Sequence, residues 1–342
     1  MEFDPRNILV IDFGQLGDVV MSLPALRAIR ARFPYARITV AVGKPGGELI
    51  GLSGYANDIL EVDRVALRDG PKLISIGRIL KFVASVRKAK FDFVIDLHSL
   101  YETNLLGFLS GATHRLYARR ENRSLDLLAN FQPRPNRERK EAHLVDRYLD
   151  ILKPLGIQNP PRTPALNTSS AADFAIESLL KKEKAHSREL LVGLFPGAGH
   201  VGRIWPLENF AELADHLIRN EKVRVVVFAG PEERGRVPEM RTLFPPTTIF
   251  FDRLTIPQLA SAQARLTLFI SNDTGPAHIA AAVGTPVIVL LDRPDPHSYT
   301  PVGTFNRLIC GQSITKIHVR EVYQTAHEML AASRIDQIIS RG

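Results

Sequence analysis

Cysteine and long apolar runs are almost absent from this 342-residue sequence. The single cysteine, Cys310, cannot form an internal disulfide, which fits a reducing compartment. The longest apolar run, residues 279–291, is interrupted by glycine, threonine and proline, and it is shorter than the ~20 residues needed to span a bilayer. The chain opens at Met1 without a signal-peptide pattern. We therefore expect a cytoplasmic protein that can at most lie against a membrane.

Acidic residues are outnumbered by basic ones, and most of the excess lies in one stretch. The chain has 44 lysine and arginine residues and 36 acidic residues, which gives a formal net charge of +8. Residues 115–140 alone hold eight basic and three acidic side chains. Such a stretch suits phosphates, an anionic glycolipid or a membrane surface, although a solvated basic loop has the same composition. Nucleic acid is not expected as a partner, because no recognition motif accompanies the charge.

Strand and helix patterns alternate through both halves of the chain. Buried strands are predicted at residues 7–11, 38–42, 91–97, 190–195, 223–229 and 266–270. This alternation is typical of α/β domains whose parallel sheets are covered by helices. Three prolines within residues 160–164 form a stiff connector. We place a first domain at 1–160, a second at 161–320, and two closing helices, about 319–332 and 334–340, at the end of the chain.

Two polar side chains of the first half fall at the carboxyl ends of predicted strands, where parallel sheets bind ligands. Asp18 follows the first strand, where a helix patterned from Val19 to Phe33 begins, and His98 follows the strand at 91–97. Asp18 either caps the helix or acts as a general base. A helix start would lower the pKa of a carboxylate and so reduce its basicity. His98 is either a hydrogen-bonded structural residue or part of an acceptor site.

The second half contains a glycine pattern that is typical of dinucleotide-binding proteins. Residues 197–202 follow a strand and satisfy G-x-G-x-x-G. In that fingerprint the helix begins within the glycines, whereas here the helix pattern starts only at Leu207. The pattern is therefore a weak indication of a dehydrogenase. A glycine loop with Glu232 or Glu233 at the end of the next strand would also hold a diphosphate and a ribose.

The stretch 271–291 is the strongest indication of a binding site. A strand runs into a polar turn, Pro276 can start a helix at its first position, and Gly284 ends that helix before a further strand. Backbone N–H groups at the helix start, beside the positive end of the helix dipole, would bind phosphate or another anion. Asp273 and Thr274 would in any case be ordinary capping residues.

Three motifs resemble those of glycosyltransferase family 9, the ADP-heptose:lipopolysaccharide heptosyltransferases and their relatives. They are Leu16-Gly17-Asp18-Val19-Val20 with Leu23-Pro24-Ala25-Leu26, Arg203-Ile204-Trp205-Pro206, and Ser271 to His278 with Gly284-Thr285-Pro286. They stand in the family's order and extend over most of the chain. The resemblance implies a GT-B architecture, in which two Rossmann-like domains with parallel sheets face each other across a cleft. It also implies that the closing helices return towards the N-terminal domain.

The resemblance further implies an inverting, metal-independent transfer of heptose from ADP-heptose to the core of a lipopolysaccharide or a related glycan. No Asp-x-Asp motif or cysteine/histidine cluster is present, and no cofactor is expected. By motif, Asp18 matches the catalytic base. Arg203 stands where the family usually has lysine and would neutralise the leaving diphosphate.

The donor and acceptor sites combine these motifs with the strand-end residues. The predicted donor-binding residues are Gly197, Gly199, Glu232, Glu233, Asp273, Thr274, Gly275, Pro276 and His278. The predicted acceptor-binding residues are Gly17, His98, Arg119, Arg120 and Arg123. The expected partners are a nucleotide-sugar, an anionic glycolipid or glycan, and the cytoplasmic face of the inner membrane. An NAD(P)-dependent oxidoreductase and a non-catalytic GT-B nucleotide-binding protein are the alternatives.

Overall fold

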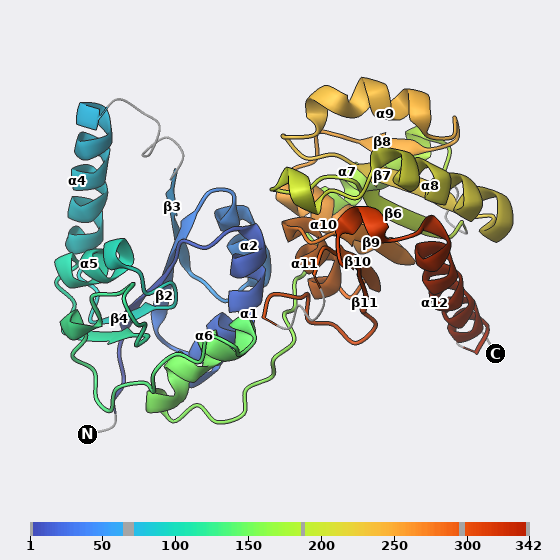
Figure 1. Ribbon diagram of the computed structural model, residues 1–342. Coiled ribbons are helices and arrows are strands. Elements are labelled where there is room, and N and C mark those ends of the chain that lie inside the picture. Colours follow the sequence, from blue (N-terminus) through green and yellow to red (C-terminus); the bar gives the residue numbers. More distant parts are fainter. Residues whose placement is uncertain (1–2, 64–71, 186–188, 294–297, 340–342) are drawn as a thin grey trace. The chain divides into compact units, whose positions relative to one another are not determined.

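The computed structural model describes residues 3–63, 72–185, 189–293 and 298–339. It divides into two compact units, Met1–Pro164 and Ala165–Gly342, and each contains a parallel sheet with helices packed on it (Figure 1). The division falls at the end of the proline-rich connector.

The first unit is built on a five-stranded parallel sheet in the order β3-β2-β1-β4-β5. Its strands are β1 (Asn7–Asp12), β2 (Arg37–Gly43), β3 (Asp58–Val62), β4 (Phe93–Asp96) and β5 (His114–Tyr117). Its helices are α1 (Leu16–Arg32), α2 (Gly46–Ser53), α4 (Lys72–Lys88), α5 (Tyr101–Leu109) and α6 (Leu144–Leu152). The central strands β1 and β4 are buried almost throughout, as expected where helices cover a parallel sheet.

The second unit is built on a six-stranded parallel sheet in the order β11-β10-β9-β6-β7-β8. Its strands are β6 (Leu191–Phe195), β7 (Arg224–Phe228), β8 (Ile249–Phe251), β9 (Leu268–Asn272), β10 (Val287–Leu291) and β11 (Arg307–Cys310). Its helices are α7 (Ser170–Lys182), α8 (Leu207–Glu221), α9 (Val237–Leu243), α10 (Ile256–Gln263), α11 (Gly275–Ala282) and α12 (Val319–Ile339). The carboxyl ends of β10, β9, β6 and β7 therefore lie side by side along one edge.

The described residues from Val319 to Ile339 form one helix, α12, where the sequence predicts two. The expected break lies near Ser333, but the Ser333 hydroxyl donates to the Met329 carbonyl at 3.1 Å, so it bonds within the helix instead of interrupting it. The helix packs against α8 in the second unit. A return of this helix towards the first unit stays a prediction.

The buried side chain of Glu221, at the end of α8, fixes the packing of α12. Its carboxylate accepts a hydrogen bond from the Tyr323 hydroxyl at 2.9 Å and from the Arg334 guanidinium at 3.0 Å, and it lies 2.7 Å from Nδ1 of His327. These partners hold the pKa of Glu221 below its usual value despite its burial, which acts in the opposite direction. In the described ranges, no helix combines the length and apolar character needed to cross a bilayer.

Candidate active site

The pairing of β1 with β4 brings the predicted residue His98 next to an aspartate. Ile11 pairs with Asp96 across the two strands, and the His98 N–H donates to the Ile11 carbonyl at 3.3 Å. Nδ1 of His98 then lies 4.0 Å from Oδ1 of Asp12, the last residue of β1. Asp12 was not predicted, although it ends the same buried strand that Asp18 follows.

Asp18 lies in the first turn of α1, which begins at Leu16 and not at Val19. Its Oδ2 accepts a hydrogen bond from the Gln15 N–H at 2.9 Å, while Oδ1 of Asp12 accepts one from the Gly14 N–H at 3.0 Å. A Cβ atom at Gly14 would overlap Cβ of Asp18 and crowd both carboxylates. The absence of a side chain at Gly14 therefore lets the two aspartates approach each other across the turn.

The pKa of Asp18 is raised overall, although the helix start lowers it as expected. Burial is the largest cause, because it disfavours the charged form. The bond from the Gln15 N–H lowers the pKa, the negative charge of Asp12 raises it, and the positive charges of Arg147 and Arg120 lower it. Asp18 does bond to the helix start, as the capping interpretation predicts, but its burial leaves it a stronger proton acceptor than an ordinary aspartate.

Arg120 belongs to a buried ion network and not to a solvated loop. Its Nε lies 3.0 Å from Oε1 of Glu138, and Nη2 of Arg147 lies 2.6 Å from the same oxygen. The three side chains are between 9% and 12% exposed. Of the other predicted acceptor residues, Arg119 is half-buried and Arg123 is exposed. The structure thus adds Arg147 to the charges that act on Asp18, and it places Glu138 as the partner of both arginines.

Much of the remaining charge of residues 115–140 is paired within the unit. The ion pairs are Arg134 with Asp126, Arg137 and Lys140 with Glu121, and Arg139 with Asp150. Arg115 donates to the carbonyls of Ala112 and Leu128. The local excess of positive charge that the sequence suggests for ligand binding is therefore partly used to hold this segment in place.

Asn272, the last residue of β9, joins the two family-like motifs of the second unit. Its Oδ1 accepts a hydrogen bond from the backbone N–H of Trp205 at 3.0 Å, and its Nδ2 donates to the Pro196 and Gly197 carbonyls at 3.2 and 3.0 Å. The side chain is fully buried. The predicted glycine loop, the segment that carries Arg203 and the turn after β9 are therefore held together by one amide.

Four charged side chains gather where β9 and β10 end. Oδ2 of Asp273 lies 2.9 Å from Nη2 of Arg293 and 3.8 Å from Nη1 of Arg203. Asp292 lies 3.7 Å from Arg293 and 4.0 Å from Arg203. The Arg203 side chain is 45% exposed and holds its carboxylate neighbours at longer distances than Arg293 does, so it is available to an incoming anion. Asp292 and Arg293 were not predicted.

The start of α11 differs from the predicted capping arrangement. Thr274 occupies the N-cap position, but among the described residues its side chain makes no capping bond, and the carboxylate of Asp273 turns to Arg293 instead. Pro276 has no N–H, and the Ala277 N–H donates to the Thr274 carbonyl at 3.1 Å. Of the backbone N–H groups of residues 274–277 that were predicted to bind an anion, those of Thr274 and Gly275 are therefore the candidates that remain.

His278, also predicted for the donor site, is 5% exposed and lies inside the second unit. Its role in donor binding stays a prediction.

The two predicted glycines of the loop after β6 have different surroundings. A Cβ atom on Gly197 would overlap the carboxylate of Glu233, whereas one on Gly199 would meet nothing within 4 Å. Oε2 of Glu233 accepts the Gly230 N–H at 3.0 Å, and burial raises the pKa of Glu233. Glu232 is exposed beside it. Gly197 and Glu233 are therefore packed together, and Gly199 and Glu232 border the same loops at the surface.

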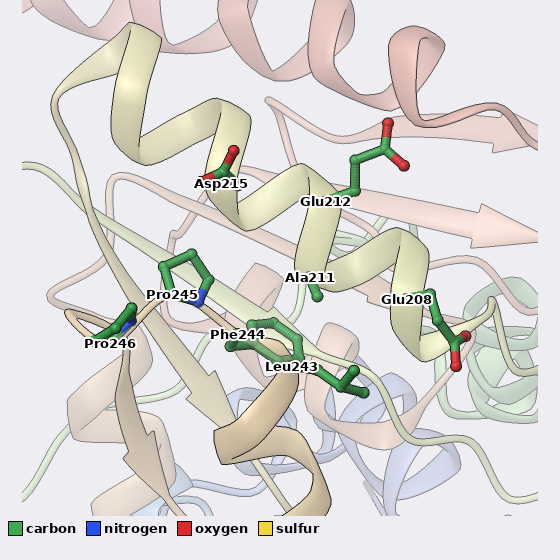
Figure 2. Close-up of a pocket in the computed structure, with 8 residues that line it drawn as sticks. All are labelled: Glu208, Ala211, Glu212, Asp215, Leu243, Phe244, Pro245 and Pro246. Carbon is green, nitrogen blue, oxygen red and sulfur yellow. The ribbon is translucent and has the colours of Figure 1, made fainter.

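A separate groove of about 470 Å³ lies between α8 and the segment after α9 (Figure 2). Its lining residues are Glu208, Ala211, Glu212, Asp215, Leu243, Phe244, Pro245 and Pro246. It contains none of the predicted site residues. Across the described parts of the chain, no three histidine, cysteine or acidic side chains are grouped where a metal ion could bind.

Comparison with known proteins finds relatives over most of the chain. The model of glycosyltransferase family 9 (heptosyltransferase) matches residues 79–327. The lipopolysaccharide core heptosyltransferase OpsX of Haemophilus influenzae is 23% identical over 312 residues, which cover 89% of this chain and 84% of OpsX. The family 9 glycosyltransferase of Veillonella parvula, a solved structure, has a TM-score of 0.84 at 21% identity, over 97% of this chain and 99% of that one.

The structure of Escherichia coli heptosyltransferase WaaC with ADP has a TM-score of 0.76 at 21% identity, over 94% of this chain and 99% of that one. Together with the two parallel-sheet units, these neighbours confirm the GT-B fold that the motifs predict. Arg203 and the turn at 271–278 fall within the residues that match the family model, whereas Asp18 lies before them.

Proposed function

Because the chain belongs to glycosyltransferase family 9, we propose that it transfers a heptose from ADP-heptose to the core of a lipopolysaccharide or a related anionic glycan. The observation that carries the proposal is the cluster of Arg203 and Asp273 at the start of α11, on the edge where parallel sheets bind ligands. Relatives that act on lipopolysaccharide and a neighbour solved with ADP support the choice of acceptor and donor.

The transfer is an inverting displacement. Asp18, deprotonated, takes the proton of an acceptor hydroxyl while the hydroxyl oxygen attacks the anomeric carbon from the side opposite the leaving group. The bond from that carbon to the diphosphate oxygen breaks, and ADP leaves with the electron pair. The raised pKa of Asp18 suits this role, because a base accepts a proton best when its pKa approaches the working pH.

Arg203 and the N–H groups of Thr274 and Gly275 stabilise the charge that develops on the diphosphate. Removing one preorganised donor of this kind typically raises a barrier by ~2.7–4 kcal/mol. With these groups no metal ion is required, so turnover is expected to persist in the presence of a chelator. Loss of turnover with EDTA and its recovery with a divalent cation would contradict this part of the proposal.

The variant Asp18→Asn tests the assignment of the base. We expect it to keep thermal stabilisation by ADP and to lose almost all transfer to a purified core acceptor. Asp215→Asn, which alters an exposed aspartate on α8, is the matched control and should retain transfer. Unchanged turnover in Asp18→Asn would refute the role of Asp18, and absence of stabilisation by ADP in the unaltered protein would refute the donor.

The dehydrogenase alternative lacks the geometry that its glycine fingerprint requires. Residues 201–203, which include the last glycine of the pattern, form a short 3₁₀ turn, and α8 begins only at Leu207. A dinucleotide site needs the helix N-terminus against the pyrophosphate within the glycine motif. We therefore expect no stabilisation of the protein by NADH or NADPH.

A further inference from the structure

Helix α4 carries apolar side chains that nothing in the described part of the chain covers. Ile76, Ile79 and Leu80 are 53%, 45% and 64% exposed. Figure 1 shows the N-terminal half of α4 extending away from the sheet of the first unit, while its other end lies beside α5. Large apolar side chains gathered in this way are an uncommon surface feature unless something binds them.

The exposed residues belong to a stripe that is partly used in the core of the first unit. Ile76, Ile79, Leu80 and Val83 follow the i, i+3, i+4, i+7 spacing of one helix face. Val83 packs against the core cluster and Val86, one turn further, is fully buried in it. The same helix face is therefore apolar along its whole length. Its C-terminal half is buried in the core of the first unit, whereas its N-terminal half is exposed.

The charge of α4 is of one sign. Its sequence contains five basic residues and no acidic residue, and the side chains of Arg78 and Lys81 are exposed between the apolar positions. The neighbouring helix α5 adds exposed Leu105 and Phe108, and the Arg115 guanidinium lies 5.5 Å from the centre of the Phe108 ring. A basic helix with an exposed apolar face is typical of segments that lie in the interface of an anionic bilayer.

We propose that the N-terminal half of α4 docks on an anionic lipid bilayer, with Ile76, Ile79 and Leu80 among the headgroups and the basic side chains on the lipid phosphates. The inference deepens the proposed function, because an acceptor with a lipid anchor lies in such a bilayer and the docked helix would keep the enzyme beside it. The membrane contact predicted from the basic stretch 115–140 is thereby assigned to a different segment, since much of that stretch is paired internally.

Co-sedimentation of the full chain with vesicles tests the proposal. We expect binding to vesicles of phosphatidylcholine with phosphatidylglycerol, and binding at least about tenfold weaker to phosphatidylcholine alone or at ~0.5 M salt, where screening is strong. The variant Ile76→Ser/Ile79→Ser/Leu80→Ser should lose at least about tenfold in partitioning, because it removes most of the apolar surface that enters the interface. The control Tyr35→Ser/Phe174→Ser removes two side chains that are 99% and 74% exposed elsewhere and should bind as before.

A second variant reports insertion directly. The chain has one tryptophan, Trp205, which is fully buried, so Leu80→Trp introduces the only exposed indole. Its emission should shift to shorter wavelength with anionic vesicles. No shift, or equal partitioning of the triple variant and its control, would overturn the proposal. Concentration-dependent dimerisation that the triple variant abolishes, without any vesicle binding, would overturn it in favour of a second copy of the chain.

These readouts do not depend on turnover. A protein that binds vesicles through α4 but is not stabilised by ADP would refute the proposed function alone. A protein that transfers sugar to a delipidated acceptor but ignores vesicles would refute the membrane contact alone.

Discussion

The substitution Asn272→Asp would replace one nitrogen by oxygen at the centre of the second unit and test whether one amide holds the donor site together. The new carboxyl group could still accept the Trp205 N–H, but its second oxygen would face the Pro196 and Gly197 carbonyls that the amide now satisfies. Two hydrogen bonds would be replaced by contacts between two acceptor oxygens, at a side chain that is fully buried from solvent.

The expected loss of stability is large but not complete. A buried acceptor that loses its donor costs ~1–3 kcal/mol, and two carbonyls lose theirs here, so we expect roughly 2–6 kcal/mol, with the buried negative charge placing it at the upper end. A typical domain stability of ~5–15 kcal/mol exceeds this loss over most of its range, so we expect the second unit to stay folded but to be weakened. Thermal stabilisation by ADP should fall with it, because the glycine loop and the Arg203 segment lose their common anchor.

The sign of the pH dependence follows from the same contacts. Burial and the facing carbonyls would raise the pKa of the new carboxyl group above its unfolded value. The protonated form can donate to one carbonyl, so the deficit relative to the unaltered protein should be smallest at low pH and should grow as the pH rises through the folded-state pKa.

Urea unfolding followed by tryptophan fluorescence measures this deficit at several pH values, since Trp205 is the sole tryptophan and reports the second unit. Asn167→Asp, at an exposed position of the same unit, is the control. A deficit below ~1 kcal/mol, or one that does not change with pH, would refute the reasoning.

Two further predictions concern the loops around the site. Gly197→Ala should displace Glu233, lower the melting temperature and weaken ADP binding about tenfold, because overpacking typically costs ~1–3 kcal/mol. The control Gly199→Ala should leave the melting temperature and ADP binding unchanged. Calorimetry of both variants with and without ADP measures these effects, and equal effects in the two variants would contradict the packing of Gly197 against Glu233. Arg147→Met removes a charge that lowers the pKa of Asp18, so the acidic limb of the kcat/KM profile should move to higher pH; an unmoved limb would show that this charge does not act on the base.

The alternating pattern was sufficient to predict both sheets, but it missed short elements whose sequences do not favour them. Helix α2 opens with Gly46 and Gly47, which are poor helix formers, and its helix depends on packing against α1 and β2. Strand β5 has only four residues, with His114 and Arg115 half-exposed, and it exists because β4 offers an edge. These elements form because of tertiary contacts, and a local sequence pattern contains no information on such contacts.

The candidate site divides in the same way. Asp18, Arg203 and Asp273 could be found from the sequence because each stands in a motif at or near a strand end. Arg147 and Arg293 could not, since what matters is the partner each meets: Glu138 in the first unit and Asp273 in the second. The net rise of the Asp18 pKa was missed for the same reason, because the burial of a side chain depends on residues far away in the chain.

The contact between α8 and α12 has a consequence for the order of events during synthesis. The first unit is complete once Pro164 has been made, so it can fold while the ribosome still adds the second. The second unit has no such freedom. Its α8 ends at a buried carboxylate, Glu221, whose partners Tyr323, His327 and Arg334 follow it in the chain by 102, 106 and 113 residues. Until they arrive that carboxylate lacks these partners, so the nascent second unit is the stage at which this chain most needs protection from aggregation.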